Sequence, residues 1–153
     1  MTVEEKLRQM GLELPPAPAP VAAYVPCVRA GNLLFISGQI PKEKGELKYR
    51  GHAGKELNVE EAAQAARLCA LNALSQVKQE LGDFARLKRI VKVTGYVSSA
   101  AGFHEQPKVL DGASRFLEEV LGEKGKHARV TVGVNELPLN VAVEVEMIAE
   151  VEG

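Results

Sequence analysis

Tryptophan is absent from the 153 residues, aromatic residues make up only 5%, and just two cysteines occur, Cys27 and Cys69. The two cysteines have neither the paired spacing of a zinc site nor that of a CxxC redox motif. Each lies in an apolar context, which favours buried thiols in a reducing cytosol over a disulfide. The cysteine content therefore excludes a small disulfide-stapled scaffold.

Excess charge of either sign is also absent, since 19 basic and 20 acidic side chains leave a formal net charge of −1. Such a chain has no long-range field that would gather nucleic acid or an anionic membrane surface. The basic residues at 86, 88, 89 and 92 lie close together but lack interleaved aromatics, so nucleic-acid binding is not favoured.

Long hydrophobic runs are missing as well. No stretch approaches the roughly 18 apolar residues that a membrane span needs. The first 16 residues contain acids and lack the apolar core of a signal peptide. These absences predict a cytoplasmic protein without membrane contact.

The composition present is that of one ordinary globular domain, with 46% hydrophobic and 25% charged residues. Residues 1–20 form a prefix, in which Thr2 can cap a short helix that ends at Gly11 and prolines 15, 16, 18 and 20 make an extended connector. Residues 21–153 form the domain itself.

The domain begins with a predicted hairpin of residues 21–29 and 33–37, followed by a polar, glycine-containing loop over 42–55 that could form a rim or lid. Asn58 and Glu61 form a capping box for a long helix that ends at Gly82. A strand over 89–99 and a helix from Pro107 to Gly122 follow.

The last quarter reads as a closing hairpin, with residues 128–134 and 139–149 flanking a turn at 135–138. In this register Arg129 lies opposite Glu144, and the face carrying Val130 and Val132 belongs to the core. The whole order predicts an α+β fold with one mixed sheet and two helices on one face. Because nothing in the chain covers the other face, we expect a homo-oligomer.

The other face of this hairpin carries Arg129, Thr131 and Gly133 beside Glu144 and Glu146. It is either a solvated cross-strand ion pair or the wall of a pocket, in which the arginine fork binds a carboxylate and a glutamate polarises water. Ser37 and Gly38 end a buried strand, either as a simple turn or as backbone that a ligand approaches closely. Spacing does not decide between these alternatives.

Three separated motifs resemble the YjgF/Rid family of reactive-intermediate deaminases, also called L-PSP endoribonuclease-like. They are GNLLFISGQIP at 31–41, HAR at 127–129, and ELP at 136–138 followed by VEVE at 143–146. The prefix and the amino-acid sequence of the second helix resemble those of a divergent subgroup of this family. The resemblance covers residues 21–151 and implies a chorismate-mutase-like fold, a homotrimer with a central barrel, and clefts between subunits.

The resemblance also implies hydrolysis of enamine or imine intermediates such as 2-aminoacrylate to 2-keto acids and ammonia, with no cofactor and no metal. Arg129 matches the arginine that binds the substrate carboxylate, and Glu144 matches the glutamate that orients water. Tyr24 matches an aromatic residue of the cleft. Ser37 and Gly38 match cleft backbone, and Thr131 matches a position whose main chain contacts ligand.

Two departures concern the second helix, where Leu110 and Ala113 replace the asparagine and the aromatic of active deaminases. A trimer that binds small carboxylates without turnover is therefore the alternative function. A ribonuclease is the third, but the sequence offers no catalytic histidine pair: His52, His104 and His127 are interpreted as solvated surface residues.

Overall fold

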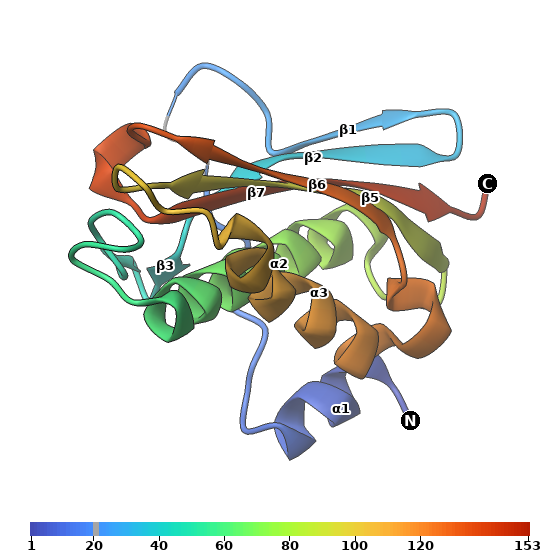
Figure 1. Ribbon diagram of the computed structural model, residues 1–153. Coiled ribbons are helices and arrows are strands. Elements are labelled where there is room, and N and C mark those ends of the chain that lie inside the picture. The colour runs from blue at the N-terminus through green and yellow to red at the C-terminus, as the bar shows by residue number, and fades with distance from the viewer. Residues whose placement is uncertain (20–21) are drawn as a thin grey trace.

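Five strands form one twisted mixed sheet, and two helices cover one of its faces (Figure 1). The structure is a computed structural model that describes residues 1–19 and 22–153. The strand order is β1-β2-β7-β5-β6, with bounds β1 Cys27–Ala30, β2 Leu33–Gln39, β5 Leu87–Ser98, β6 Ala128–Val134 and β7 Val143–Val151. The expected α+β class with one mixed sheet is confirmed.

All three predicted helices are present, and their ends lie within two residues of the predicted ones. They are α1 (Val3–Gln9), α2 (Val59–Leu81) and α3 (Gln106–Leu121). Two short 3-10 turns follow, η1 (Gly122–Gly125) between α3 and β6 and η2 (Pro138–Asn140) between β6 and β7. Asn58 and Glu61 form the predicted capping box of α2, which satisfies two backbone N–H groups that a helix start leaves free. A Cβ at Gly112 would lie 2.0 Å from the carbonyl oxygen of Ala63, so this glycine lets α3 approach α2 closely.

The first hairpin is confirmed, with β1 and β2 paired antiparallel from Cys27 to Ile36. The first strand begins at Cys27, so the described residues 22–26 are not the strand that the sequence predicts. The predicted boundary between prefix and domain at 20–21 lies outside the described residues. The polar residues and glycines at 42–55 indicate an exposed loop. Instead it contains the small hairpin of β3 (Lys42–Glu43) and β4 (Glu46–Leu47), and its end is buried at Gly51 and Ala53.

The predicted closing hairpin is wrong, because β6 and β7 are not neighbours. β5 lies between them and pairs in parallel with β6 and antiparallel with β7. Helix α3 therefore acts as the crossover connection that two parallel strands require. Consequently Arg129 pairs with Val93 and Glu144 pairs with Tyr96, rather than with each other.

The face assignment is right for β7 and wrong for β6. On β7 the alternate residues from Val143 to Val151 are buried under the helices. On β6 the valines at 130 and 132 are 42% and 41% exposed on the open face, while Arg129 faces α3. For both strands the alternation was predicted correctly, and only on β6 was the side that the helices cover predicted wrongly.

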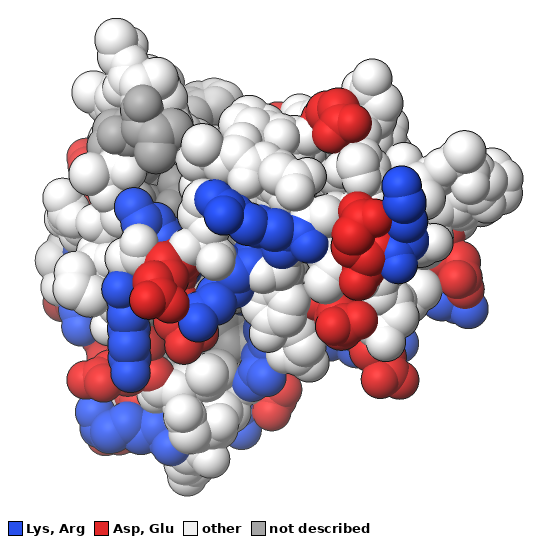
Figure 2. Space-filling model, turned by 90° about the vertical axis from the view of Figure 1, so that its left-hand side faces the viewer, with Lys and Arg blue, Asp and Glu red and all other residues white. Residues whose placement is uncertain are grey.

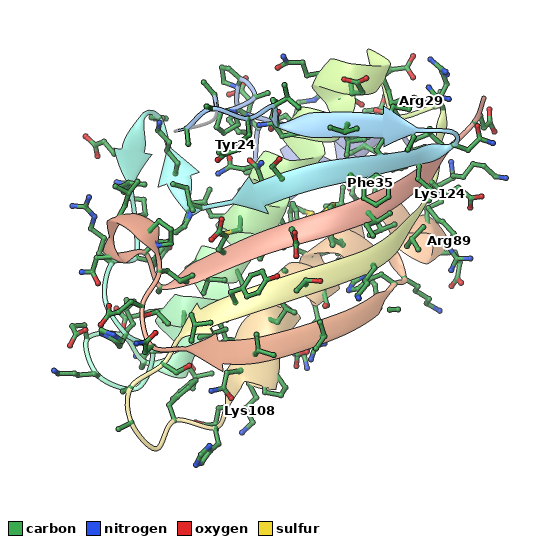
Figure 3. The ribbon with its side chains drawn as sticks, turned by 90° about the horizontal axis from the view of Figure 1, so that it is seen from above. Tyr24, Arg29, Phe35, Arg89, Lys108 and Lys124 are labelled. Atoms are coloured by element: carbon green, nitrogen blue, oxygen red, sulfur yellow. The ribbon has the colours of Figure 1, made fainter. Side chains whose placement is uncertain are left out.

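The sheet face opposite the helices is uncovered within the described chain, as the sequence predicted (Figure 3). Phe35 is 42% exposed on it and Val28 is 51% exposed. No helix in the described residues is long and apolar enough to cross a membrane. In the same residues no three His, Cys, Asp or Glu side chains gather as metal ligands.

Both cysteines are free thiols, with Cys69 buried and Cys27 partly buried. Burial, and secondarily Glu80, raises the pKa of the Cys27 thiol to about 11. Burial also raises the pKa of Cys69. Neither thiol is activated as a nucleophile at neutral pH.

Candidate active site

A cavity of about 590 Å³ opens where β2 and β7 meet the N-terminal segment and the η2 turn. Four of the six predicted site residues line it: Tyr24, Ser37, Gly38 and Glu144. Figure 3 places Tyr24 in the segment before β1, beside the open side of β2. The structure therefore brings these four together, although they come from three separate parts of the chain.

A bulge in β2 directs its backbone toward this cavity. The pairing of β2 with β7 shifts register between Ile36 and Gln39, so Ser37 and Gly38 leave the regular ladder. The Ser37 hydroxyl donates to the carbonyl oxygen of Val25 at 2.8 Å. The Ser37 side chain is therefore occupied by this hydrogen bond, and Ser37 contributes to the cavity chiefly through its backbone.

Gly38 and Glu144 are sterically matched. A Cβ on Gly38 would lie 2.2 Å from Oε2 of Glu144, so only glycine lets this carboxylate lie against the backbone of the bulge. Burial, and secondarily the neighbouring Glu146, raises the pKa of Glu144 above its ordinary value. A carboxyl group with a raised pKa can both accept and donate a proton near neutral pH.

Glu146 and Tyr96 extend the site along the open face of the sheet. The Tyr96 hydroxyl donates to Oε1 of Glu146 at 2.7 Å. This bond, together with burial, raises the pKa of Tyr96. The sequence predicted that Glu146 lies on the same face as Glu144, but it did not indicate Tyr96 as a site residue. Tyr96 lies near these glutamates because β5 is the neighbour of β7, and no local pattern shows that pairing.

Arg129 lies elsewhere, on the edge strand β6 and on the helix side of the sheet. Its Nη1 donates to Oδ1 of Asp111 at 2.9 Å and to Oγ of Ser114 at 3.2 Å, and its Nη2 donates to the carbonyl oxygen of Pro107 at 3.1 Å. Thr131 follows it on the same strand. In a single chain, therefore, the structure does not bring Arg129 and Thr131 together with Glu144.

The guanidinium of Arg129 is nevertheless held in one orientation. Three of its five N–H donors have acceptors on α3, which leaves two for a ligand among the groups that the structure describes. Oγ of Ser114 also lies 2.8 Å from Nε2 of His127. His127 is thus part of this cluster and not the solvated residue that the sequence indicated.

The two residues of α3 that differ from those of active deaminases are core residues. Leu110 and Ala113 are fully buried, and Leu110 packs over Gly95, where a Cβ would meet its side chain at 2.6 Å. Within one chain neither residue lines the cavity. Their burial explains the close packing of α3 on β5.

Comparisons with known proteins agree with this architecture. A family model described as "YjgF/chorismate mutase-like, putative endoribonuclease" matches residues 4–151. Protein TCP17 of Trypanosoma cruzi is 44% identical over 149 residues, which are 97% of this chain and 93% of that protein. The crystal structure of Atu1372, a protein of unknown function from Agrobacterium tumefaciens, has a TM-score of 0.93 and 44% identity, covering 98% of this chain and 92% of that one.

A more distant relative carries the name of an enzyme. The 2-iminobutanoate/2-iminopropanoate deaminase of Dermatophagoides farinae is 29% identical over 141 residues, which are 92% of this chain and 95% of that protein.

Proposed function

The chain belongs to the YjgF/chorismate mutase-like family, and from this premise we propose that it hydrolyses small carboxylate-bearing enamines or imines to 2-keto acids and ammonia. The observation that carries the proposal is the Glu144 carboxyl group, half-buried against Gly38 with a raised pKa in a cavity large enough for a small ligand. The relative named 2-iminobutanoate/2-iminopropanoate deaminase supports this reaction class.

The site is complete only when a second copy of the chain contributes its edge strand β6. Arg129 on that strand keeps two N–H donors, and a planar guanidinium binds a carboxylate through two parallel hydrogen bonds. The open sheet face, with Phe35 and Val132 more than 40% exposed, supports such an assembly. We propose a homotrimer, the state that the family resemblance implies.

The reaction then needs little beyond positioning and proton transfer. Arg129 binds the substrate carboxylate, and the enamine tautomerises to the imine, its carbon gaining a proton as its nitrogen loses one. Glu144 accepts a proton from water as the water oxygen bonds to the imine carbon, and returns it to nitrogen. The carbinolamine then collapses: its hydroxyl proton passes to nitrogen, the C–N bond breaks, and the carbonyl and ammonia form. Holding these groups in place supplies most of the rate, since the intermediate already reacts with water.

The Arg129–Asp111 ion pair favours a second candidate, a trimer that binds carboxylates without turning them over. Asp111 already offsets the arginine charge, so carboxylate binding would be weaker and better suited to sensing a metabolite. RNA cleavage has less support, because basic and acidic side chains are interspersed on the face in Figure 2 and form no basic groove there.

A coupled assay with freshly generated 2-aminoacrylate tests the proposal. We expect ammonia release above the buffer rate and a loss of at least about 100-fold in Arg129→Ala. Arg115→Ala is the matched control, because Arg115 also reaches Asp111, at 3.7 Å, but is largely exposed. Unchanged turnover in Arg129→Ala would contradict the proposal. Binding of 2-keto acids that depends on Arg129, without turnover, would favour the second candidate.

A further inference from the structure

The N-terminal segment is fixed to the domain on the side away from the open sheet face. Helix α1 carries its own capping box, formed by Thr2 and Glu5. Leu7 is only 1% exposed, and Nζ of Lys78 on α2 lies 2.8 Å from Oε1 of Glu4. From α1 the chain runs as an extended strap, residues 12–19, toward the cavity.

A buried pair of amide side chains ties the end of this strap to the cleft. Gln76 on α2 is 2% exposed, and its Nε2 donates to the carbonyl oxygen of Pro18 at 2.7 Å. The same nitrogen lies 3.4 Å from Oε1 of Gln39, whose own Nε2 donates to the carbonyl oxygen of Ser37 at 3.0 Å. Buried amides are costly to leave unpaired, so this chain of bonds fixes the distance between strap and bulge.

The strap presents apolar side chains to the cavity. Pro18 and Ala19 line it together with Ala22, and the acids Glu144 and Glu146 also lie on its wall. The volume of about 590 Å³ falls in the range of pockets that hold ligands much larger than 2-aminoacrylate. A three-carbon substrate would leave the apolar wall in contact with water.

We propose that the strap forms an apolar subsite that selects substrates by side chain: 2-imino or 2-keto acids with branched or longer aliphatic chains, in preference to those of the size of pyruvate. This inference rests on the function proposed above and names the substrate class of the same site. The specificity-determining residues of this subsite are Pro18 and Ala19 of the strap, together with Ala22. Gln76 is a positioning residue, which acts through Pro18 without touching the ligand.

Calorimetric titration of the chain of residues 1–153 with pyruvate, 2-oxobutanoate and 4-methyl-2-oxopentanoate tests the subsite. Burying one methylene group improves affinity roughly fourfold, so we expect 4-methyl-2-oxopentanoate to bind at least about tenfold more tightly than pyruvate. Equal affinities for the three acids would overturn the subsite and leave the proposed function intact. No binding of any of them would overturn both.

Two substitutions then locate the subsite. Ala22→Phe should fill the subsite and so remove the preference for 4-methyl-2-oxopentanoate over pyruvate. Ala23→Phe is the matched control, since Ala23 is the next residue, is exposed and does not line the cavity. A preference that survives Ala22→Phe, or one that Ala23→Phe removes equally, would contradict the assignment.

Gln76→Leu tests whether the hydrogen bond from Gln76 to Pro18 positions the strap. The change keeps approximate size but removes the bond to Pro18, so we expect the preference for the larger acid to fall by at least about threefold with pyruvate affinity unchanged. Ser75→Ala, at the neighbouring buried position of α2, reports any general damage to the helix. If Gln76→Leu lowered the affinities for pyruvate and for 4-methyl-2-oxopentanoate equally, Gln76 would act only on stability.

Discussion

Glu144 is held in a setting that disfavours its charge. Its carboxyl group is half-buried against Gly38, and Glu146 lies two residues further along the same face of β7. Both effects raise its pKa from the ordinary value of 4.5, with burial the larger. The folded state therefore binds the Glu144 proton more strongly than the unfolded chain does.

The sign of this shift gives a prediction for stability. Ionisation of Glu144 as the pH rises above 4.5 opposes folding, so Glu144→Gln should raise the free energy of unfolding at pH 7.5 and leave it nearly unchanged at pH 4. The same variant should lose at least about 100-fold in deamination. Urea unfolding at the two pH values, with the 2-aminoacrylate assay, measures both effects.

Glu150→Gln is the control, because Glu150 lies on the same face of β7 and near Lys88, at 3.9 Å. A stability gain of equal size in both variants would show that it has nothing to do with the cavity. A Glu144→Gln variant less stable at pH 7.5 than the original chain would contradict the argument.

At the scale of elements, His52 joins two loops that are far apart in sequence. Its Nδ1 lies 3.2 Å from Oε1 of Glu56, and its Nε2 lies 2.8 Å from the carbonyl oxygen of Asn135 and 3.3 Å from Oε1 of Glu136. With 22% of its side chain exposed, it is not the solvated residue that the sequence indicated. The second loop leads directly into η2, whose Pro138 and Leu139 line the cavity.

Both ring nitrogens of His52 face acceptors, so the protonated imidazole is favoured. Its hydrogen bond to Glu56 is the main cause of a pKa raised above 6.5, and the bond to Asn135 is the second. A raised histidine pKa adds stability that is fully present below 6.5 and is lost as the pH rises through the folded-state value.

We therefore expect thermal stability to fall between pH 6 and 8.5 more steeply in the original chain than in His52→Gln. Amide exchange in residues 135–140 should accelerate over the same range. His104→Gln is the control, since His104 is exposed. Identical pH profiles in the original chain and in His52→Gln would contradict the role of His52.

At the scale of the whole molecule, the main feature is the sheet face opposite the helices, whose apolar side chains the described chain leaves uncovered. Figure 3 shows Phe35 on this face, and Val28, Val130 and Val132 are also between 41% and 51% exposed. Apolar side chains on an uncovered sheet are stabilised when another copy buries them. The same association would bring Arg129 of one copy toward the cavity of another.

A charge on this face should prevent assembly. We expect Val132→Lys to convert the proposed trimer into a folded monomer that lacks the proposed deamination, because a lysine cannot be buried there without a partner. Light scattering coupled to gel filtration gives the mass, and circular dichroism verifies the fold. Glu118→Lys on the exposed side of α3 is the control. A Val132→Lys monomer with full activity would contradict the shared site.

The sequence by itself determined the helices and, on β6 and β7, which residues of a strand share a face. Asn58 and Glu61 start α2, Gly82 ends it, and the alternation from Val143 to Val151 separates a buried from an open row. These features follow from contacts between residues a few positions apart. The motif residues Ser37, Gly38 and Glu144 were found in the same way, as local patterns that resemble a family.

Only the tertiary structure decided which strands are neighbours and which side of each strand the helices cover. A period-two pattern shows that Val130 and Val132 share a face with each other, but not that this face is the open one. That choice depends on α3, which crosses the sheet and returns β6 to the far side of β5. The crossover, the burial and the Gln76–Pro18 bond all join distant segments, so no local pattern encodes them. The crossover places Arg129 and Glu144 on opposite faces of the sheet in one chain, because Arg129 pairs with Val93 and Glu144 pairs with Tyr96.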